Sequence, residues 1–245
     1  MNRAFSFSTP RRVMILAAAL ALAGCGGGGG GGDAPATVLP VIPLAAGFAS
    51  YVNGQASYSV TYSGTAISPT GQQLPFSGSG LVNETTTASV FEGLPALRKD
   101  MTQSGQFVIL GTGYPVTAAS SSYFDTNYAP IGSISPDGYC VVTDYHPLPV
   151  TARPGDNAIW FSSTCYSNAT RSVRIGSSST SWVLESESDN TARFKTIVNL
   201  TDNTGASGTS NMTLRVSTTG AITRLGESGT LSQDGITMNY VGTYQ

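Results

Sequence analysis

The sequence predicts an all-β domain in which antiparallel strands follow one another as a meander and close into a barrel-like or half-barrel calyx. Only 11% of the 245 residues are charged, whereas Ser, Thr and Gly are plentiful and Tyr and Val recur at intervals, as is typical of strands. Turn motifs are closely spaced, and the segments between them alternate apolar and polar residues. A β-sandwich is the alternative, because stacking two sheets also hides strand edges.

The turn motifs divide the chain into short runs, and Gly or Asn in each motif supplies the positive φ that tight hairpins need. Alternation is clearest at 58–62 and 196–200, where one side chain in two is apolar. The last 65 residues resemble a meander of hairpins. The predicted strands are 55–63, 74–83, 86–91, 106–111, 117–124, 138–143, 158–164, 172–175, 180–187, 192–200, 210–217, 221–231 and 235–244.

Two stretches fit the strand pattern less well. Residues 94–101 are the only helical candidate, a turn and a half in length. The apolar residues 41–42 and 44–46 either dock on the domain as a first strand or remain loose. We therefore predict a single antiparallel β domain over residues 44–245.

An apolar run at 13–23 follows three arginines near the N-terminus and ends in the motif Leu22-Ala23-Gly24-Cys25. Eleven helical residues span roughly 16 Å, about half of the hydrocarbon core that a spanning helix must cross. The run is therefore predicted to be an export signal, residues 1–24, and not a membrane span.

The motif resembles the lipobox of bacterial lipoprotein precursors. This resemblance implies that the signal is cut before Cys25 and that the Cys25 thiol carries a diacylglycerol, with a further acyl chain, typically palmitate, on the freed amine. Position 26 is Gly and not Asp, which in the Gram-negative members implies transfer to the outer membrane. Residues 25–43 begin with the lipidated cysteine and seven glycines and would form a flexible spacer.

Charge limits the partners of the mature chain. Of the 12 Lys and Arg residues three lie in the signal, and the 9 that remain stand against 14 Asp and Glu residues, for a formal net charge of −5. A weakly acidic chain with dispersed arginines lacks the electrostatic footprint of a nucleic-acid-binding protein. The expected partners are the membrane, through the lipid, and an unknown envelope protein or a small apolar or glycan ligand.

Aromatic residues crowd the middle of the chain, where prolines are also frequent. The candidate ligand-facing residues are Tyr114, Tyr123, Tyr128 and Tyr145. One interpretation is an aromatic mouth that stacks on a sugar, a lipid or a peptide. The other is that the tyrosines pack against hairpin faces while the prolines, which exclude an interior strand, shape a crossover loop.

Cys140 and Cys165 remain once Cys25 is assigned to the lipid. An exported chain enters an oxidising compartment, so we predict a disulfide between them. In the chain-entropy account this link would contribute roughly 3.5 kcal/mol to stability. A zinc site lacks ligands because His146 is the only histidine, and we expect neither a metal nor another cofactor.

Catalytic motifs are scarce. The chain contains no Gly-x-Ser-x-Gly motif, and any histidine-based triad would depend on His146. Glu185 and Glu187 lie two residues apart on one face of a presumed strand, a spacing near that of glycosidase carboxylates. We therefore predict a non-catalytic outer-membrane lipoprotein whose periplasmic or surface-exposed β domain binds or scaffolds an envelope component. The alternative is a hydrolase of envelope polymers that uses carboxylates near an aromatic cleft.

Overall fold

The computed structural model describes residues 39–188, 190–233 and 235–245. The predicted signal at 1–24, the lipobox with Cys25 and the linker up to residue 38 lie outside the described residues. The described part contains one helix and twelve strands. These are α1 (Leu44–Asn53), β1 (Ala56–Ile67), β2 (Gln73–Phe91), β3 (Leu94–Ile109), β4 (Thr112–Phe124), β5 (Pro130–Ser135), β6 (Gly138–Tyr145), β7 (Asn157–Tyr166), β8 (Arg174–Ser188), β9 (Thr191–Asp202), β10 (Ser207–Ser217), β11 (Ile222–Gln233) and β12 (Ile236–Tyr244).

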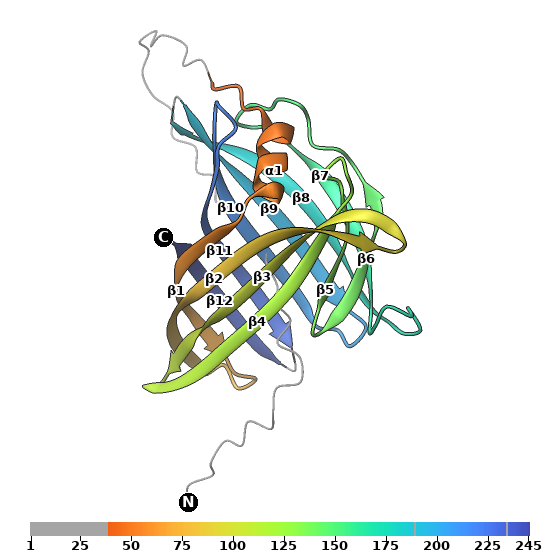
Figure 1. Ribbon diagram of the computed structural model, residues 1–245. Helices are drawn as coiled ribbons and strands as arrows, with labels where there is room; N and C mark the ends of the chain where they lie inside the picture. The colour runs from red at the N-terminus through yellow and green to blue at the C-terminus, as the bar shows by residue number, and fades with distance from the viewer. Residues whose placement is uncertain (1–38, 189, 234) are drawn as a thin grey trace, which may run out of the picture.

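The twelve strands form one closed barrel in which each strand pairs antiparallel with the next in the chain (Figure 1). The first and last strands complete the ring, with Val60 of β1 opposite Tyr244 of β12. Closure gives the first and last strands a partner on both sides. The predicted all-β meander that closes as a barrel is therefore confirmed, and the chain does not form the alternative sandwich.

Strand alternation places apolar side chains inside the barrel. In β1, Val60 and Tyr62 are buried, whereas Ser59, Thr61 and Ser63 between and beside them are exposed. The same period of two continues in β8, where Trp182 and Leu184 are buried and Glu185 is not. β1 and β8 therefore each contribute one largely apolar face to the interior and one polar face to the outside.

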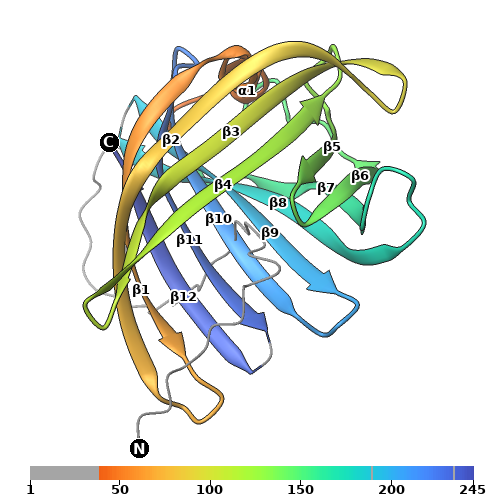
Figure 2. The same ribbon diagram turned by 60° about the horizontal axis from the view of Figure 1, so that its bottom comes forward.

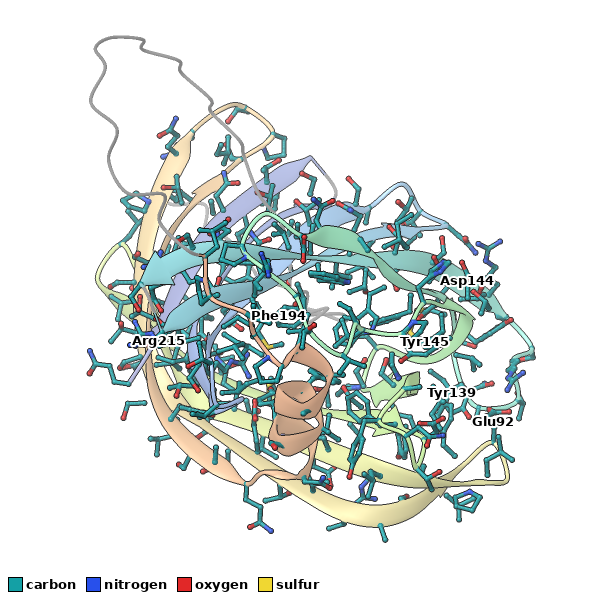
Figure 3. The ribbon with its side chains drawn as sticks, turned by 90° about the horizontal axis from the view of Figure 1, so that it is seen from above. Glu92, Tyr139, Asp144, Tyr145, Phe194 and Arg215 are labelled. Carbon is teal, nitrogen blue, oxygen red and sulfur yellow. A yellow bond between two sulfur atoms is a disulfide. The ribbon has the colours of Figure 1, made fainter. Side chains whose placement is uncertain are left out.

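The helix α1 closes one end of the barrel, and Figure 3 shows it lying across that end. Residues 44–46 thus form neither a first strand nor a loose segment. The N-terminus of α1 has no side-chain cap, so packing stabilises the helix more than local signals do. Phe48 contacts Trp160 and Phe124 edge-on, with ring centroids 4.8 and 5.8 Å apart. Gly47 allows close approach, because a Cβ there would lie 3.0 Å from the Gly220 carbonyl oxygen.

The prediction of a helix at 94–101 is wrong, because this segment begins the long strand β3. Glu92 and Gly93 have φ values of 52° and 79°, the two positive angles of a tight hairpin turn. From this turn Phe91 pairs with Leu94, and the register continues to Phe76 opposite Ile109. Sixteen cross-strand pairs override the weak helical preference of a short segment.

The proline-rich middle is also corrected. The strands predicted at 117–124 and 138–143 lie within β4 and β6, but β5 between them was not predicted, and only the stretch between β6 and β7 is a long loop. Pro115 lies inside β4 opposite Gln106 of β3. Its missing N–H is tolerated because β5 pairs only with Ser121–Phe124 of β4, so the earlier part of β4 extends beyond β5.

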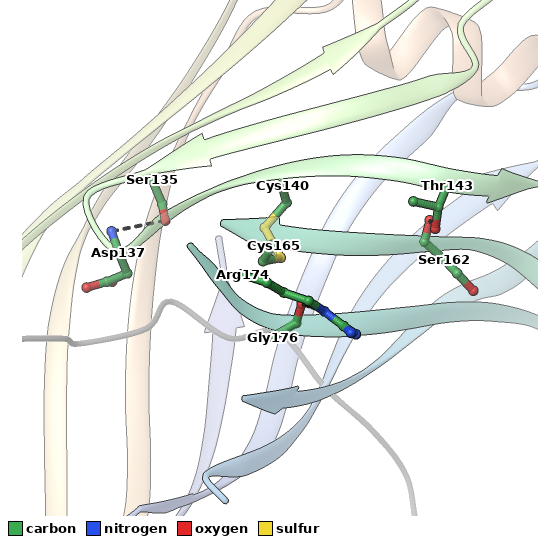
Figure 4. Close-up of a disulfide and its surroundings, with 8 residues drawn as sticks. All are labelled: Ser135, Asp137, Cys140, Thr143, Ser162, Cys165, Arg174 and Gly176. Atoms are coloured by element: carbon green, nitrogen blue, oxygen red, sulfur yellow. Dashed lines mark hydrogen bonds between the residues drawn. A yellow bond between two sulfur atoms is a disulfide. The ribbon is translucent and has the colours of Figure 1, made fainter. Parts of the chain in front are cut away.

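The predicted disulfide joins Cys140 of β6 to Cys165 of β7 (Figure 4), two residues that face each other in the strand register. The bond closes a loop with a sequence separation of 25. That loop contains the proline-rich connection between the two strands. The link therefore holds the β6–β7 pair together near the end of the barrel that lies away from α1.

Replacing Cys140 and Cys165 together by serine should lower the free energy of unfolding by about 2–4 kcal/mol, because the unfolded chain regains the entropy of an open loop. Urea unfolding of the oxidised protein and of the double variant measures the difference. Reduced wild type serves as the matched control and should unfold like the variant. Equal stabilities of oxidised and reduced wild type would contradict this role.

Candidate functional site

A cavity of about 380 Å³ lies inside the barrel. It extends from Phe48 and Tyr51 of α1 to Asp137, in the turn between β5 and β6, and Gly138 at the start of β6. Figure 2 shows this turn at the end of the barrel away from α1. The volume of the cavity falls within the range of small-molecule sites, about 300–1,000 Å³.

The cavity wall combines apolar and aromatic side chains with small hydroxyl groups. Phe124, Trp160 and Phe161 supply aromatic surface, and Met101 and Met212 supply flexible apolar surface. Both cysteines of the disulfide also border the cavity. Eight hydroxyl-bearing residues from five strands complete the wall: Ser120, Ser122, Ser133, Ser135, Ser163, Ser178, Thr180 and Thr196.

Four charged residues form a buried group beside the cavity, named here the internal charge cluster: Glu84, Lys99, Arg224 and Glu227. Arg224 Nη1 donates to Glu84 Oε1 at 2.6 Å, and Arg224 Nη2 donates to Glu227 Oε2 at 2.9 Å. Lys99 Nζ lies 3.3 Å from Glu84 Oε2. Two carboxylates therefore balance two cations, which is the condition under which charges tolerate burial.

The internal charge cluster also fastens α1 to the barrel. Lys99 Nζ donates to the carbonyl oxygens of Tyr51 and Gly54 at 3.0 and 2.9 Å, where the C-terminus of the helix carries partial negative charge. The Tyr51 hydroxyl donates to Glu84 at 3.0 Å. Burial, reinforced by the Glu84 carboxylate, raises the pKa of Tyr51, so its hydroxyl keeps the proton that it donates.

The four predicted ligand-facing tyrosines do not gather at one site. Tyr123 borders the cavity, and its ring stacks on Phe91 with centroids 4.5 Å apart. Tyr114 is 39% exposed near the turn between β3 and β4. The Tyr128 hydroxyl accepts a hydrogen bond from Asn53 at 2.9 Å, and Tyr145 packs against the core cluster beneath α1. Of these four tyrosines, only Tyr123 therefore borders the cavity.

A second aromatic group packs at the tip of the β2–β3 hairpin. The Phe91 ring also stacks on Tyr139, at 5.3 Å between centroids. The Tyr139 hydroxyl donates to Glu92, which pairs with Arg171, and Figure 3 shows Glu92 beside Tyr139. Burial, followed by this bond to Glu92, raises the pKa of Tyr139 to about 12. Both carboxylate oxygens of Glu92 are partnered in this arrangement, which helps to hold the hairpin in place.

The carboxylates considered for catalysis do not face the cavity. Glu185 pairs with Lys195 at 2.6 Å on the polar face of β8. Asp144 and His146 lie 3.3 Å apart, but both side chains are more than half exposed. The carboxylates in the described lining are Glu84, held by two cations, and Asp137 in the distant turn. No facing pair of the glycosidase kind is formed there.

Glu187 belongs to an ion network outside the cavity. Arg215 donates to both of its carboxylate oxygens, at 2.6 and 2.7 Å, and Arg193 donates at 3.1 Å. The hydrogen bonds from Arg215, followed by those from Arg193, lower the pKa of Glu187 from 4.5 to about 2. Figure 3 shows Arg215 pointing away from the barrel interior.

Replacing Glu187 by glutamine should lower the free energy of unfolding at pH 7, because the charged hydrogen bonds to Arg215 and Arg193 are lost. The loss should be only about 1 kcal/mol, because solvent screens the half-exposed arginines. Since the folded pKa is lowered, the stabilisation is complete above pH 4.5 and disappears as the pH falls towards 2. Urea unfolding from pH 7 to pH 2 measures the difference in free energy of unfolding between wild type and variant. A difference that stays constant down to pH 2 would refute the stabilising role of the ionised Glu187.

Sequence reasoning missed the internal charge cluster and the helix. The available signal was a charge at an inward position of an alternating strand, as for Glu84, which lies two residues after buried Val82. Such a signal shows that a partner is needed but not which residue supplies it.

Among the described residues, no group of three or more His, Cys, Asp or Glu side chains is arranged to hold a metal ion.

The fold and the site define a class: a twelve-stranded antiparallel barrel, closed at one end by a helix, with an internal cavity beside a buried charge cluster. Comparison with protein-family models, curated proteins and solved structures found no match. Within residues 39–188, 190–233 and 235–245, no helix combines the length and the apolar character needed to cross a bilayer.

Proposed function

We propose that this chain is a non-catalytic lipoprotein of the outer membrane whose barrel binds a small apolar or amphipathic molecule of the cell envelope. The observation that carries the proposal is the cavity of about 380 Å³ with its aromatic and methionine-rich wall. Sites of this size and lining exclude water from most of the surface of a ligand.

The polar outer face of β1 supports a domain surrounded by water. Outward positions of β1 are Ser57, Ser59 and Thr61, all exposed. A membrane-spanning barrel shows the opposite pattern, with apolar residues outside. The anchor would then be the lipid on Cys25, and the barrel would lie on the periplasmic side or at the cell surface.

The first experiment is native mass spectrometry and lipid extraction of the mature protein purified from its own envelope. A co-purifying apolar molecule that is lost on unfolding supports the proposal and gives the ligand class. The Phe48→Trp variant, which enlarges a side chain in the cavity wall, is the matched control and should retain less ligand. Repeated recovery of empty protein, together with no uptake of an apolar fluorescent probe, would refute the proposal.

Replacing Cys25 by serine should release the protein from the membrane, because the acyl chains supply the attachment. Burial of two or three chains, at about 0.8 kcal/mol per methylene, makes attachment effectively permanent. Fractionation of the envelope, together with intact mass, compares wild type with the variant. Serine at Cys140 and Cys165 leaves Cys25 in place and is the control. Continued membrane retention of the Cys25 variant would exclude the lipid anchor.

A further inference from the structure

Four buried polar atoms of the cavity wall have no hydrogen-bond partner among the described residues, and two of these, Glu84 Oε2 and Arg224 Nε, belong to the internal charge cluster. The two uncharged ones are Trp160 Nε1, a donor, and Thr180 Oγ1, a donor and acceptor. The two side chains are 4% and 3% exposed. A buried polar group without a hydrogen bond costs about 1–3 kcal/mol, so two of them in one wall indicate a place where a ligand is recognised.

The strand register places Trp160 and Thr180 at neighbouring positions of adjacent strands. Phe161 of β7 lies opposite Thr180 of β8, and the register shifts between Ile159 and Phe161. Trp160 is therefore the extra residue of a β-bulge, and bulges redirect side chains next to binding sites. As a result, the consecutive residues Trp160 and Phe161 both border the cavity.

The charges around the cavity restrict the ligand further. Glu84, Lys99 and Arg224 border the cavity, but each is paired inside the internal charge cluster. The other charged residue of the described lining is Asp137, in the β5–β6 turn. A ligand carboxylate would bring an additional negative charge into this apolar space without a free cation to balance it.

Resting on the proposed function, we infer that the ligand is uncharged and that it carries a carbonyl or hydroxyl oxygen which accepts hydrogen bonds from Trp160 Nε1 and Thr180 Oγ1. Its apolar body packs against Phe124, Phe161 and Met212. Uncharged esters, ketones and alcohols with an alkyl chain or a ring system have this chemistry.

The test compares three probes of eleven carbons on the secreted full-length Cys25→Ser variant: 2-undecanone, undecane and undecanoate. We expect the ketone to bind about ten-fold more tightly than either of the others at pH 7, measured by calorimetry. Thr180→Val, which is isosteric, and Trp160→Phe, which keeps an aromatic ring but removes the N–H donor, should each remove most of this preference and leave undecane binding within about two-fold.

The matched control is Trp182→Phe, the same chemical change at a buried tryptophan outside the cavity lining. It should leave the ketone preference intact and make Trp160 the single indole that reports the bound carbonyl by fluorescence. Melting curves establish that each variant is folded. Equal affinities for the three probes, or tightest binding of undecanoate, would overturn the inference but not the cavity function. Binding of none of them would overturn both.

Discussion

Replacing Arg224 by methionine should lower the free energy of unfolding by about 3–5 kcal/mol. Arg224 is 5% exposed and donates to both Glu84 and Glu227. Methionine fills much of the same volume but leaves two buried carboxylates with Lys99 as their only nearby cation in the internal charge cluster. Uncompensated buried charge is among the few causes of so large a loss. Urea unfolding at pH 7 measures it.

The matched control is Arg98→Met on the outer face of the barrel. Arg98 pairs with Asp100 at 2.9 Å, but its side chain is 41% exposed. Exposed ion pairs contribute about 0–1 kcal/mol, so the same substitution should have little effect there. If both variants lost less than about 1 kcal/mol, the internal charge cluster would not stabilise the barrel as described.

Replacing Phe48 by alanine should destabilise the protein by about 3–5 kcal/mol, the usual range for a buried phenylalanine. Phe48 is 4% exposed and connects α1 to the aromatic rings of Phe124 and Trp160. Its removal would weaken the closure of the barrel end and enlarge the cavity. Thermal and urea unfolding measure the first effect, and uptake of a larger apolar probe measures the second.

Phe48→Leu is the control, because leucine keeps an apolar side chain of similar reach. Phe48→Leu should lower the free energy of unfolding by less than half as much as Phe48→Ala. Equal losses for leucine and alanine would indicate that the aromatic contacts, and not the buried volume, hold the helix. A loss below about 1 kcal/mol for alanine would show that α1 contributes little to closure.

Local patterns were sufficient to predict the meander. The turns at Gly205, Gly220 and Gly235 have φ values of 85°, 83° and 74°, the conformation for which glycine was expected there. Alternation at 58–62 correctly placed Val60 and Tyr62 inside. The cysteine pairing was also predictable, because assigning Cys25 to the predicted lipid leaves two cysteines and a single intramolecular choice.

Features that depend on distant residues were not predictable. Glu84 and Arg224 are 140 positions apart in the chain, and neither has a local pattern that names the other. The helix α1 lacks a side-chain cap and contains Gly47, so its strongest stabilisation comes from strands that follow it. The segment 94–101 was misassigned for the same reason, since its pairing partner in β2 decides its conformation.

The connection between α1 and the internal charge cluster has a consequence for folding order. Lys99 comes from β3 and Glu84 from β2, whereas Arg224 belongs to β11 near the end of the chain. During synthesis α1 is therefore made first, but it lacks part of its packing surface until the penultimate strand, β11, has been made. Closure of β1 on β12 comes at the same late stage, and contacts of such long sequence separation make folding slow.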